Sequence, residues 1–386
     1  MNRIIFSFEK KVNYQTLEKM KFLHFPCIIL LMKNDIKTEF QNRLSNIESV
    51  LKKYLPENAN DAWKTESFGK LDGCITDEHM RNLIEPTGKL ISLGGKRWRP
   101  LLLVLCSELV GRGKIDAYEI TPLVEFAHNA SLIHDDIEDC ADTRRGQPAA
   151  HITFGIDTAL NAGSWLYFQA ATCIKNISGD EKTKNIFYEL FLEELRRLHL
   201  GQAMDILWHR NPTMLPTEDE YRAMVRNKTG TLARLAVKAG VLAGGADREK
   251  ADAAGKIAED IGTGFQIIDD VINLTSGNPG KKRGDDIVEG KKSLPVIIHL
   301  SNANSENSSE KEKLARLFEK AREEGIESSA VEEAISILEK SGSIDKARKI
   351  GNKLIEEKSK ELVNLFGNAD SDAAKLITGL FKMLRK

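Results

Sequence analysis

The sequence predicts an all-helical protein, folded as a single large bundle with a central cavity. Apolar residues recur at helical spacing over residues 190–200, 231–242 and 331–338, which is the pattern of amphipathic helices. Proline accounts for only 10 of the 386 residues, and the alternation typical of strands is absent. No shift in composition divides residues 85–300, so we expect one domain there.

The N-terminal residues differ from the rest of the chain. We expect residues 1–34 to be an extension without fixed structure, followed by an all-helical domain over residues 35–386. The apolar run Cys27–Met32 is too short to span a bilayer, which takes about 20 residues. It also lacks a small-residue cleavage site. The sequence therefore predicts no integral membrane segment and no signal peptide.

Residues 94–105 join a glycine pair, three cations and an apolar run in the order GGKRWRPLLLVL. The apolar run predicts a helix. Glycine lets backbone N–H groups approach an anion closely, and the N-terminus of a helix favours negative charge. Three cations exceed what the start of an apolar helix needs, so we interpret this segment as a phosphate site. The pattern of a nucleotide-binding P-loop is absent from the chain.

Two acidic clusters, residues 135–139 and 269–273, each end an apolar run that predicts a helix. Asp135 and Asp139 are spaced i, i+4, which places two mutually repelling carboxylates on one helix face. Such oxygen ligands suit Mg²⁺, which fills its remaining positions with water and substrate phosphate oxygens. Two such clusters facing one cavity would hold a diphosphate through shared metals. The alternative for any single cluster is solvated surface.

Cations follow both clusters. Arg144 and Arg145 lie just beyond the first one, and the planar guanidinium group matches phosphate oxygens well. A structural salt bridge to the acidic cluster is the alternative for this pair. Residues 227–230 (NKTG) and 280–292 (GKKRGDDIVEGKK) add further cations. The last stretch alone would most often be a solvated loop.

Taken in order, the motifs GGKRWRP, HNASLIHDDIED, TRRGQPAAH, GQAMD, KTG, GFQIIDDVIN and GKKRGDDIVEGKKSLP resemble those of the trans-type isoprenyl diphosphate synthases. This family makes farnesyl, geranylgeranyl and longer polyprenyl diphosphates. The resemblance is dense over residues 85–300. It implies an enzyme that uses Mg²⁺ to condense isopentenyl diphosphate with an allylic prenyl diphosphate, giving an all-trans product.

The resemblance also implies roles for individual residues. It places three Mg²⁺ ions with bound diphosphate on Asp135, Asp139 and Asp269. It implies that isopentenyl diphosphate binds to Lys96, Arg99, His128 and Arg145. It implies that the allylic substrate binds to Arg144, Lys228, Thr229, Gln266, Lys282 and Lys291. Asp136 and Asp270 complete the implied catalytic set, in which Gln266 and Thr229 are candidates to orient dipoles toward a carbocation.

One position departs from the family pattern. The second cluster usually ends in aspartate, whereas this chain has Asn273. An amide oxygen can still coordinate a metal or accept a hydrogen bond from a metal-bound water, but it carries no charge. We therefore expect weaker metal affinity and retained activity.

Product length is predicted from the helix that carries the first cluster. The growing chain should run along that helix past Ser131 and Ala130, which are both small, toward Phe126 one turn deeper. Leu123 would lie below, with Trp165, Leu166 and Phe168 on a facing helix. We therefore expect products of twenty carbons or more, geranylgeranyl diphosphate first and longer polyprenyl chains next. Replacing Ala130 by phenylalanine should fill the path and cut the product to about fifteen carbons.

The remaining features exclude some classes of function. A net charge of -1 gives no electrostatic basis for binding nucleic acid. Five cysteines without C-x-x-C spacing suit a reducing cytoplasm, and the family suggests a homodimer. Two alternatives remain open: a class I terpene cyclase, or a non-catalytic subunit of a heteromeric synthase. A cyclase has no second diphosphate to bind, so it has no use for Lys96, Arg99 and Arg145.

Overall fold

The computed structural model describes residues 34–111, 113–211, 213–277, 282–302 and 308–385. The predicted N-terminal extension lies outside the described residues except for Asn34, where the first described helix begins. The apolar run Cys27–Met32 and Lys281 of the basic loop lie outside them as well. The described part of the chain contains no helix that is both long and apolar enough to cross a bilayer.

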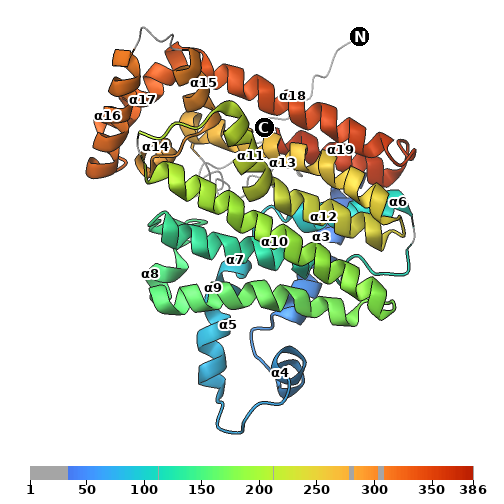
Figure 1. The fold of residues 1–386 in the computed structure, drawn as a ribbon. Coiled ribbons are helices and arrows are strands. Elements are labelled where there is room, and N and C mark those ends of the chain that lie inside the picture. Colours follow the sequence, from blue (N-terminus) through green and yellow to red (C-terminus); the bar gives the residue numbers. More distant parts are fainter. Residues whose placement is uncertain (1–33, 112, 212, 278–281, 303–307, 386) are drawn as a thin grey trace, which may run out of the picture.

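The described part of the chain is predominantly helical, with a single two-stranded hairpin, which confirms the predicted fold class (Figure 1). The N-terminal half contains α3 (Asn34–Tyr54), α4 (Asp61–Phe68), α5 (Asp77–Ser92), α6 (Trp98–Val110), α7 (Pro122–Glu138), α8 (Ala150–Phe154), α9 (Ile156–Ala170) and the 3-10 helix η1 (Ala171–Asn176). The middle contains α10 (Glu181–His209), α11 (Glu218–Lys228), α12 (Gly230–Ala243) and α13 (Arg248–Thr275). The C-terminal part contains α14 (Asp285–Glu289), α15 (Leu294–Asn302), α16 (Ser308–Glu324), α17 (Ser329–Lys340), α18 (Ser343–Asn364) and α19 (Asp372–Leu384).

Side-chain caps set where several of these helices begin. The Asp180 side chain accepts a hydrogen bond from the Thr183 backbone N–H at the start of α10, and Asp247 accepts one from Lys250 at the start of α13. Thr217 and Glu220 form a reciprocal capping box at the start of α11. Such caps satisfy backbone donors that have no partner within the helix. The three segments predicted from helical spacing lie within α10, α12 and α17, as expected.

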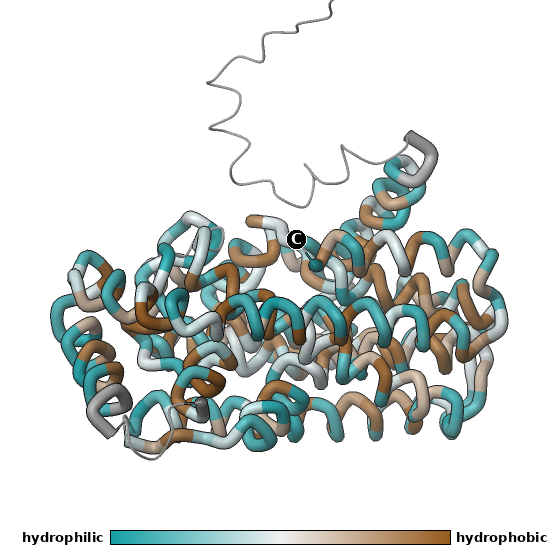
Figure 2. The backbone as a smooth tube through the Cα atoms, turned by 90° about the horizontal axis from the view of Figure 1, so that it is seen from above, coloured by the Kyte–Doolittle hydropathy of each residue, from teal (hydrophilic) through white to brown (hydrophobic). Residues whose placement is uncertain are grey.

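Helix α12 is the centre of the bundle. Nearly all of its residues are buried, and it packs against α6, α10 and α13, while α7 packs on α9 and α13 packs on α18. Gly240 lets α12 cross α6 closely, because a Cβ atom there would lie 2.2 Å from the Leu103 carbonyl oxygen. Seen from above, hydrophilic and hydrophobic residues alternate along the long helices (Figure 2), as expected for amphipathic helices packed on one another.

The structure adds one hairpin that the sequence did not predict. Strands β1 (Thr143–Arg144) and β2 (Gln147–Pro148) pair antiparallel across a two-residue turn. Arg145 (φ 52°) and Gly146 (φ 74°) occupy that turn, and positive φ at both central positions is the rule for tight hairpins of type I′. The strands are too short to show alternation. The hairpin directs Arg144 and Arg145 toward the cavity next to α7.

Candidate active site

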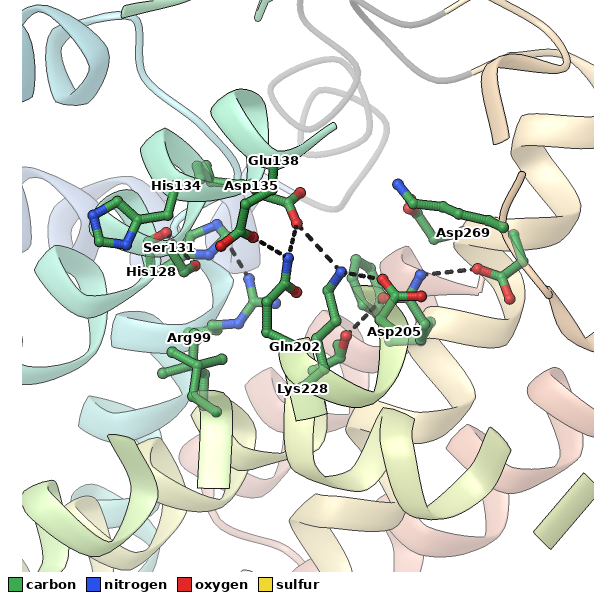
Figure 3. A pocket seen from close by; sticks show the side chains of 18 of the residues that line it. Arg99, His128, Ser131, His134, Asp135, Glu138, Gln202, Asp205, Lys228 and Asp269 are labelled. Carbon is green, nitrogen blue, oxygen red and sulfur yellow. Dashed lines mark hydrogen bonds and ion pairs between the residues drawn. The ribbon is translucent and has the colours of Figure 1, made fainter. Parts of the chain in front are cut away.

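One cavity of about 420 Å³ collects most of the predicted site residues. Residues of α6, α7, α10, α11 and α13 contribute to its wall (Figure 3). The hairpin, α9 and the segment after α14 contribute further residues. The predicted residues on this wall are Lys96, Arg99, His128, Ser131, Asp135, Arg144, Arg145, Lys228, Thr229, Gln266, Asp269, Asp270 and Lys291. Both acidic motifs therefore contribute to one cavity, although the sequence separates them widely.

The cationic side of the cavity contains Lys96, Arg99, His128 and Arg145. Arg99 Nη1 lies 3.4 Å from His128 Nε2, and Arg145 Nη1 donates to the Leu90 carbonyl oxygen at 2.9 Å. Within the described part of the chain, no carboxylate lies within ion-pairing distance of Lys96, Arg99 or Arg145, and the Arg99 Nε has no hydrogen-bond partner. This side of the cavity therefore holds positive charge that the described protein groups do not pair.

Burial and mutual repulsion perturb these cations. Burial lowers the pKa of Arg99 to about 10, although Glu125 and Asp269 act in the opposite direction. Burial likewise lowers the pKa of Arg145 to about 10 and lowers the pKa of Lys96. The pKa of His128 falls well below its usual value, first through burial and then through the nearby arginines. An anionic ligand would relieve this repulsion and stabilise the charged forms.

The first acidic motif forms the opposite wall and is held by two lysines. Lys228 Nζ bridges Asp135 (3.2 Å) and Asp205 (2.6 Å), while Lys291 Nζ lies 2.9 Å from the Asp139 carboxylate. Burial lowers the pKa of Lys228, but the two carboxylates outweigh it and raise that pKa. The Asp139 side chain is 2% exposed and is absent from the cavity wall, and burial raises its pKa. Asp135 and Asp139 thus each face a cation, from α11 or from the segment after α14.

Asp136 is the buried carboxylate of the first motif that binds Arg144. Its side chain is 1% exposed, and Arg144 Nε donates to its Oδ1 at 2.7 Å. The salt bridge considered as an alternative for Arg144 is therefore formed. Arg144 nevertheless lines the cavity, so its guanidinium group is held by Asp136 and also faces the space between the two acidic motifs. Asp136 is not among the residues that line the cavity.

In the second acidic motif the two aspartates have different surroundings. Asp269 lies on the cavity wall (Figure 3). Asp270 accepts hydrogen bonds from the Tyr221 hydroxyl (2.7 Å) and from Gln266 Nε2 (2.9 Å). Thr229 Oγ1 in turn donates to Gln266 Oε1 at 2.7 Å. Because burial raises the pKa of Asp270 to about 6, these bonds also help to keep it ionised. This series of hydrogen bonds fixes the orientation of the Gln266 amide group.

The structure differs from the expectation for Asn273. Its side chain is 1% exposed, is absent from the cavity wall, and accepts a hydrogen bond from the Asp286 backbone N–H at 3.3 Å. Its backbone carbonyl accepts from Gly284 N–H at 3.0 Å. Asn273 therefore holds the segment that brings Asp286 and Lys291 to the cavity, and its amide oxygen is already bonded. The second motif therefore contributes Asp269 and Asp270 to the cavity wall, and Asn273 does not reach it.

Lys282 does not reach the cavity. Its side chain is 66% exposed and pairs with Glu327. The placement does not support the allylic-substrate role that the resemblance implied. Lys282 follows Gly280 and Lys281, which lie outside the described residues.

The residues predicted to govern product length separate into two groups. Ser131 lies on the cavity wall, whereas Ala130 and Phe126 are fully buried in the main hydrophobic core and are absent from that wall. Phe168 is 76% exposed, so the expectation that it faces α7 is wrong. Tyr167 of α9 takes that place: its ring packs against the rings of His134 (5.5 Å) and His199 (5.2 Å) and lines the cavity.

Several cavity residues were missed by the sequence analysis, namely Glu125, Glu138, Tyr167, Gln202, Asp205, Tyr221 and Asp286. The motif GQAMD contained a usable signal, because Gln202 and Asp205 lie one helical turn apart on α10. Gln202 Nε2 donates to Asp135 Oδ1 at 3.1 Å. Tyr167 and Tyr221 carried no such signal, since their roles depend on how α9 and α11 pack.

Comparison with known proteins adds an independent observation. Residues 80–337 match the family described as Polyprenyl synthetase. A geranylgeranyl diphosphate synthase of Methanosarcina mazei is 31% identical over 334 residues, which make up 86% of this chain and 93% of that protein. A geranylgeranyl pyrophosphate synthase of Gibberella zeae is 39% identical over 233 residues, but these span only 60% of its length. The crystal structure of a geranylgeranyl pyrophosphate synthetase from Pyrococcus horikoshii superimposes with a TM-score of 0.76 at 28% identity, covering 91% of this chain and 98% of that one.

Proposed function

The chain belongs to the polyprenyl synthetase family, and we propose that it is a Mg²⁺-dependent prenyltransferase. It joins isopentenyl diphosphate to an allylic prenyl diphosphate and releases an all-trans product of twenty carbons or more. One observation carries this proposal: cations that form no ion pair with any described residue share a cavity with carboxylates of two acidic motifs. Two relatives of this chain are named geranylgeranyl diphosphate (or pyrophosphate) synthases, which favours a product of twenty carbons.

The two sides of the cavity suit two different diphosphates. Lys96, Arg99 and Arg145 form no ion pair with a carboxylate in the described part of the chain, and with His128 they line one side of the cavity. They therefore suit a diphosphate that binds without metal, which we assign as isopentenyl diphosphate. Arg144, Lys228 and Lys291 lie among carboxylates. That mixed set suits a diphosphate that arrives together with metal ions, which we assign as the allylic substrate.

The donor set fits Mg²⁺. Asp135 and Asp139 each hold a lysine ammonium group, and Asp269 lies on the facing wall, so carboxylate oxygens already surround positions of positive charge. Within the described residues, no three acidic, histidine or cysteine side chains converge closely enough to hold an ion unaided. Mg²⁺ commonly completes its shell with water and substrate phosphate. We propose that Asp135, Asp139 and Asp269 bind three such ions together with the diphosphate.

The mechanism follows from the placement of charge. Arg144, Lys228 and Lys291 neutralise the diphosphate as the allylic C–O bond breaks, which leaves a delocalised carbocation. Bound Mg²⁺ supplies further positive charge to the leaving group. The double bond of isopentenyl diphosphate attacks the cation, and the departed diphosphate takes the proton that is lost. Gln266, held by Asp270 and Thr229, presents an oriented amide dipole to the reacting carbons.

The alternatives are less compatible with this cavity. A terpene cyclase binds one diphosphate, which leaves no task for the separate cluster of Lys96, Arg99 and Arg145. A non-catalytic subunit does not need both acidic motifs and their lysines, yet Lys228 pairs with Asp135 and Lys291 pairs with Asp139. We therefore propose one all-helical catalytic unit over residues 35–386, acting in the cytoplasm. Free thiols at Cys74, Cys106, Cys140 and Cys173 suit a reducing compartment.

The division of labour between the two diphosphates can be tested by steady-state kinetics. Replacing Lys96 or Arg99 by alanine is expected to raise KM for isopentenyl diphosphate about tenfold or more, with a smaller effect on the allylic substrate. Replacing Arg144 by alanine should show the reverse. Arg43, which pairs with Glu108 at the surface away from the cavity, supplies the control substitution. Equal effects on both substrates would refute separate sites.

We further propose that a second copy of the chain covers an exposed apolar face on α9 and α10. Ile156, Leu160 and Phe168 are 59%, 49% and 76% exposed on α9, and Leu192 and Leu200 are 51% and 55% exposed on α10. These helices flank α7 in Figure 1. His199 is exposed and also lines the cavity, so the cavity wall reaches the surface at this face. A second copy would close it, which supports a homodimer.

The dimer is testable by light scattering coupled to size exclusion. Replacing Leu200 or Phe168 by glutamate should convert a species of twice the chain mass into a monomer, because each change places charge in an apolar interface. Replacing Ile75 by glutamate is the control, since Ile75 is 38% exposed outside these two helices. A monomeric wild type, or a dimer that survives both substitutions, would contradict the assignment.

A further inference from the structure

Arg97 is the one cation of the GGKRWRP motif that the proposed function does not use. It stands between Lys96 and Arg99, yet it has no place among the ligands assigned to either diphosphate. Its side chain is only 3% exposed. Arg97 lines the cavity as Lys96 and Arg99 do, but the resemblance gives a ligand role only to Lys96 and Arg99, so the position of Arg97 needs another explanation.

The Arg97 side chain ties three helices together. Its Nε donates to Glu48 Oε1 of α3 at 2.7 Å, its Nη1 donates to Glu125 Oε1 of α7 at 2.6 Å, and its Nη2 donates to the Ile91 carbonyl oxygen of α5 at 2.7 Å. All three guanidinium nitrogens are thus engaged. Glu125 is 2% exposed and also accepts a hydrogen bond from Asn129 Nδ2 at 2.9 Å.

The backbone of Arg97 is as unusual as its side chain. Arg97 has a φ of 47° and a ψ of 24°, which is the left-handed conformation that residues other than glycine seldom adopt. It follows Gly94 and Gly95, which also have positive φ, and it immediately precedes α6. Such a conformation persists only where surrounding contacts determine it. The three bonds made by the side chain are those contacts.

This backbone carries the cations of the isopentenyl diphosphate site. Lys96 precedes Arg97 directly, and Arg99 lies in the first turn of α6. Neither Lys96 nor Arg99 has a carboxylate within ion-pairing distance in the described part of the chain. Their positions therefore depend on the loop backbone and on ring contacts: Lys96 lies over Phe265 at 5.6 Å, and Arg99 lies over Trp98 at 4.5 Å.

We propose that Arg97 is a positioning residue, which holds the Gly94–Arg99 loop in its left-handed turn so that Lys96 and Arg99 are set in advance for isopentenyl diphosphate. This inference rests on the proposed function, because it deepens the role given to that cationic cluster. The Arg97 side chain donates its hydrogen bonds to the protein rather than to the substrate. Pre-organisation of this kind lowers the cost of ordering the ligands when the substrate binds.

The test compares Arg97→Met, which keeps the length and apolar stem of the side chain, with Arg97→Lys, which keeps its charge. Both should raise KM for isopentenyl diphosphate by about tenfold, with KM for the allylic substrate and kcat changed less than about twofold. Arg97→Lys should not restore the wild-type KM, because one ammonium group cannot reproduce the planar guanidinium group that donates to three acceptors. Arg43→Met is the matched control, since Arg43 bonds Glu39 and Glu108 at a place remote from the cavity.

Three outcomes would overturn the proposal. The first is an unchanged KM for isopentenyl diphosphate in Arg97→Met, and the second is a wild-type KM in Arg97→Lys. The third is an equal rise in KM for both substrates that accompanies a fall in Tm. If Arg97→Met does not fold, Glu48→Gln weakens one of the three bonds from an exposed position and should shift the same KM in the same direction by a smaller factor. Calorimetric titration with isopentenyl diphosphate alone separates the two claims. If wild type binds it, Arg97→Met binds it more weakly and neither turns over, then the proposed function fails while the positioning role stands.

Discussion

Replacing Asp135 or Asp139 by alanine is expected to reduce kcat by about a thousandfold or more, which is the scale of losing a group that stabilises charge in the transition state. Each carboxylate holds a lysine, since Asp135 bonds Lys228 and Asp139 bonds Lys291. Asp135 also presents its oxygens on the cavity wall, whereas the buried Asp139 acts beside that wall through Lys291. Removal of either carboxylate therefore weakens the proposed metal site and releases a cation that the diphosphate needs.

The fold should tolerate these substitutions. Lys228 keeps Asp205, and Lys291 keeps Glu289, so neither lysine is left without a partner. The loss of like-charge repulsion on α7 offsets part of the cost. The measurement is kcat against Mg²⁺ concentration, together with Tm. Asp142→Ala is the control, because Asp142 is an exposed carboxylate just beyond the motif and off the cavity wall. A folded variant of either aspartate with turnover within tenfold of wild type would refute the metal assignment.

Ser131→Phe is expected to shorten the product to about fifteen carbons. Ser131 lies on the cavity wall one turn before Asp135, so a ring there fills the space that a growing chain would enter. Tyr167→Ala removes a ring from the same wall and should lengthen the product. Chromatography of the dephosphorylated products measures both effects.

The neighbouring position provides the control. Ala130 is fully buried in the main core, so Ala130→Phe should overpack that core and cost about 1–3 kcal/mol of stability. This replaces the sequence-based expectation that Ala130→Phe fills the path and shortens the product. A product distribution unchanged by Ser131→Phe but shortened by Ala130→Phe would show that the chain runs on the other side of α7.

Much of this protein could be predicted from local patterns. The helices at residues 190–200, 231–242 and 331–338 follow from their apolar spacing, and the cation and carboxylate motifs follow from charge that a core would not otherwise contain. The charged residues of these motifs lie where their chemistry predicts. Asp135, Asp269, Lys228 and Arg99 all line one cavity.

What failed depends on packing between distant segments. Asn273 occupies a motif position, but its amide faces the Asp286 backbone because the residues after Gly284 fold back on α13. Lys282 sits in a basic motif and yet pairs with Glu327 at the surface. Ala130 and Ser131 are adjacent, and only the direction of α7 within the bundle decides which of them faces the cavity. No local pattern encodes that rotation.

The central claim is that this cavity elongates a prenyl chain. It is tested most directly by incubating the purified chain with Mg²⁺, labelled isopentenyl diphosphate and each allylic primer in turn, and then sizing the products. We expect label in all-trans products of twenty carbons or more, and none when the metal is chelated. Release of diphosphate from the allylic primer without incorporation of label, or products that end at fifteen carbons, would contradict the account.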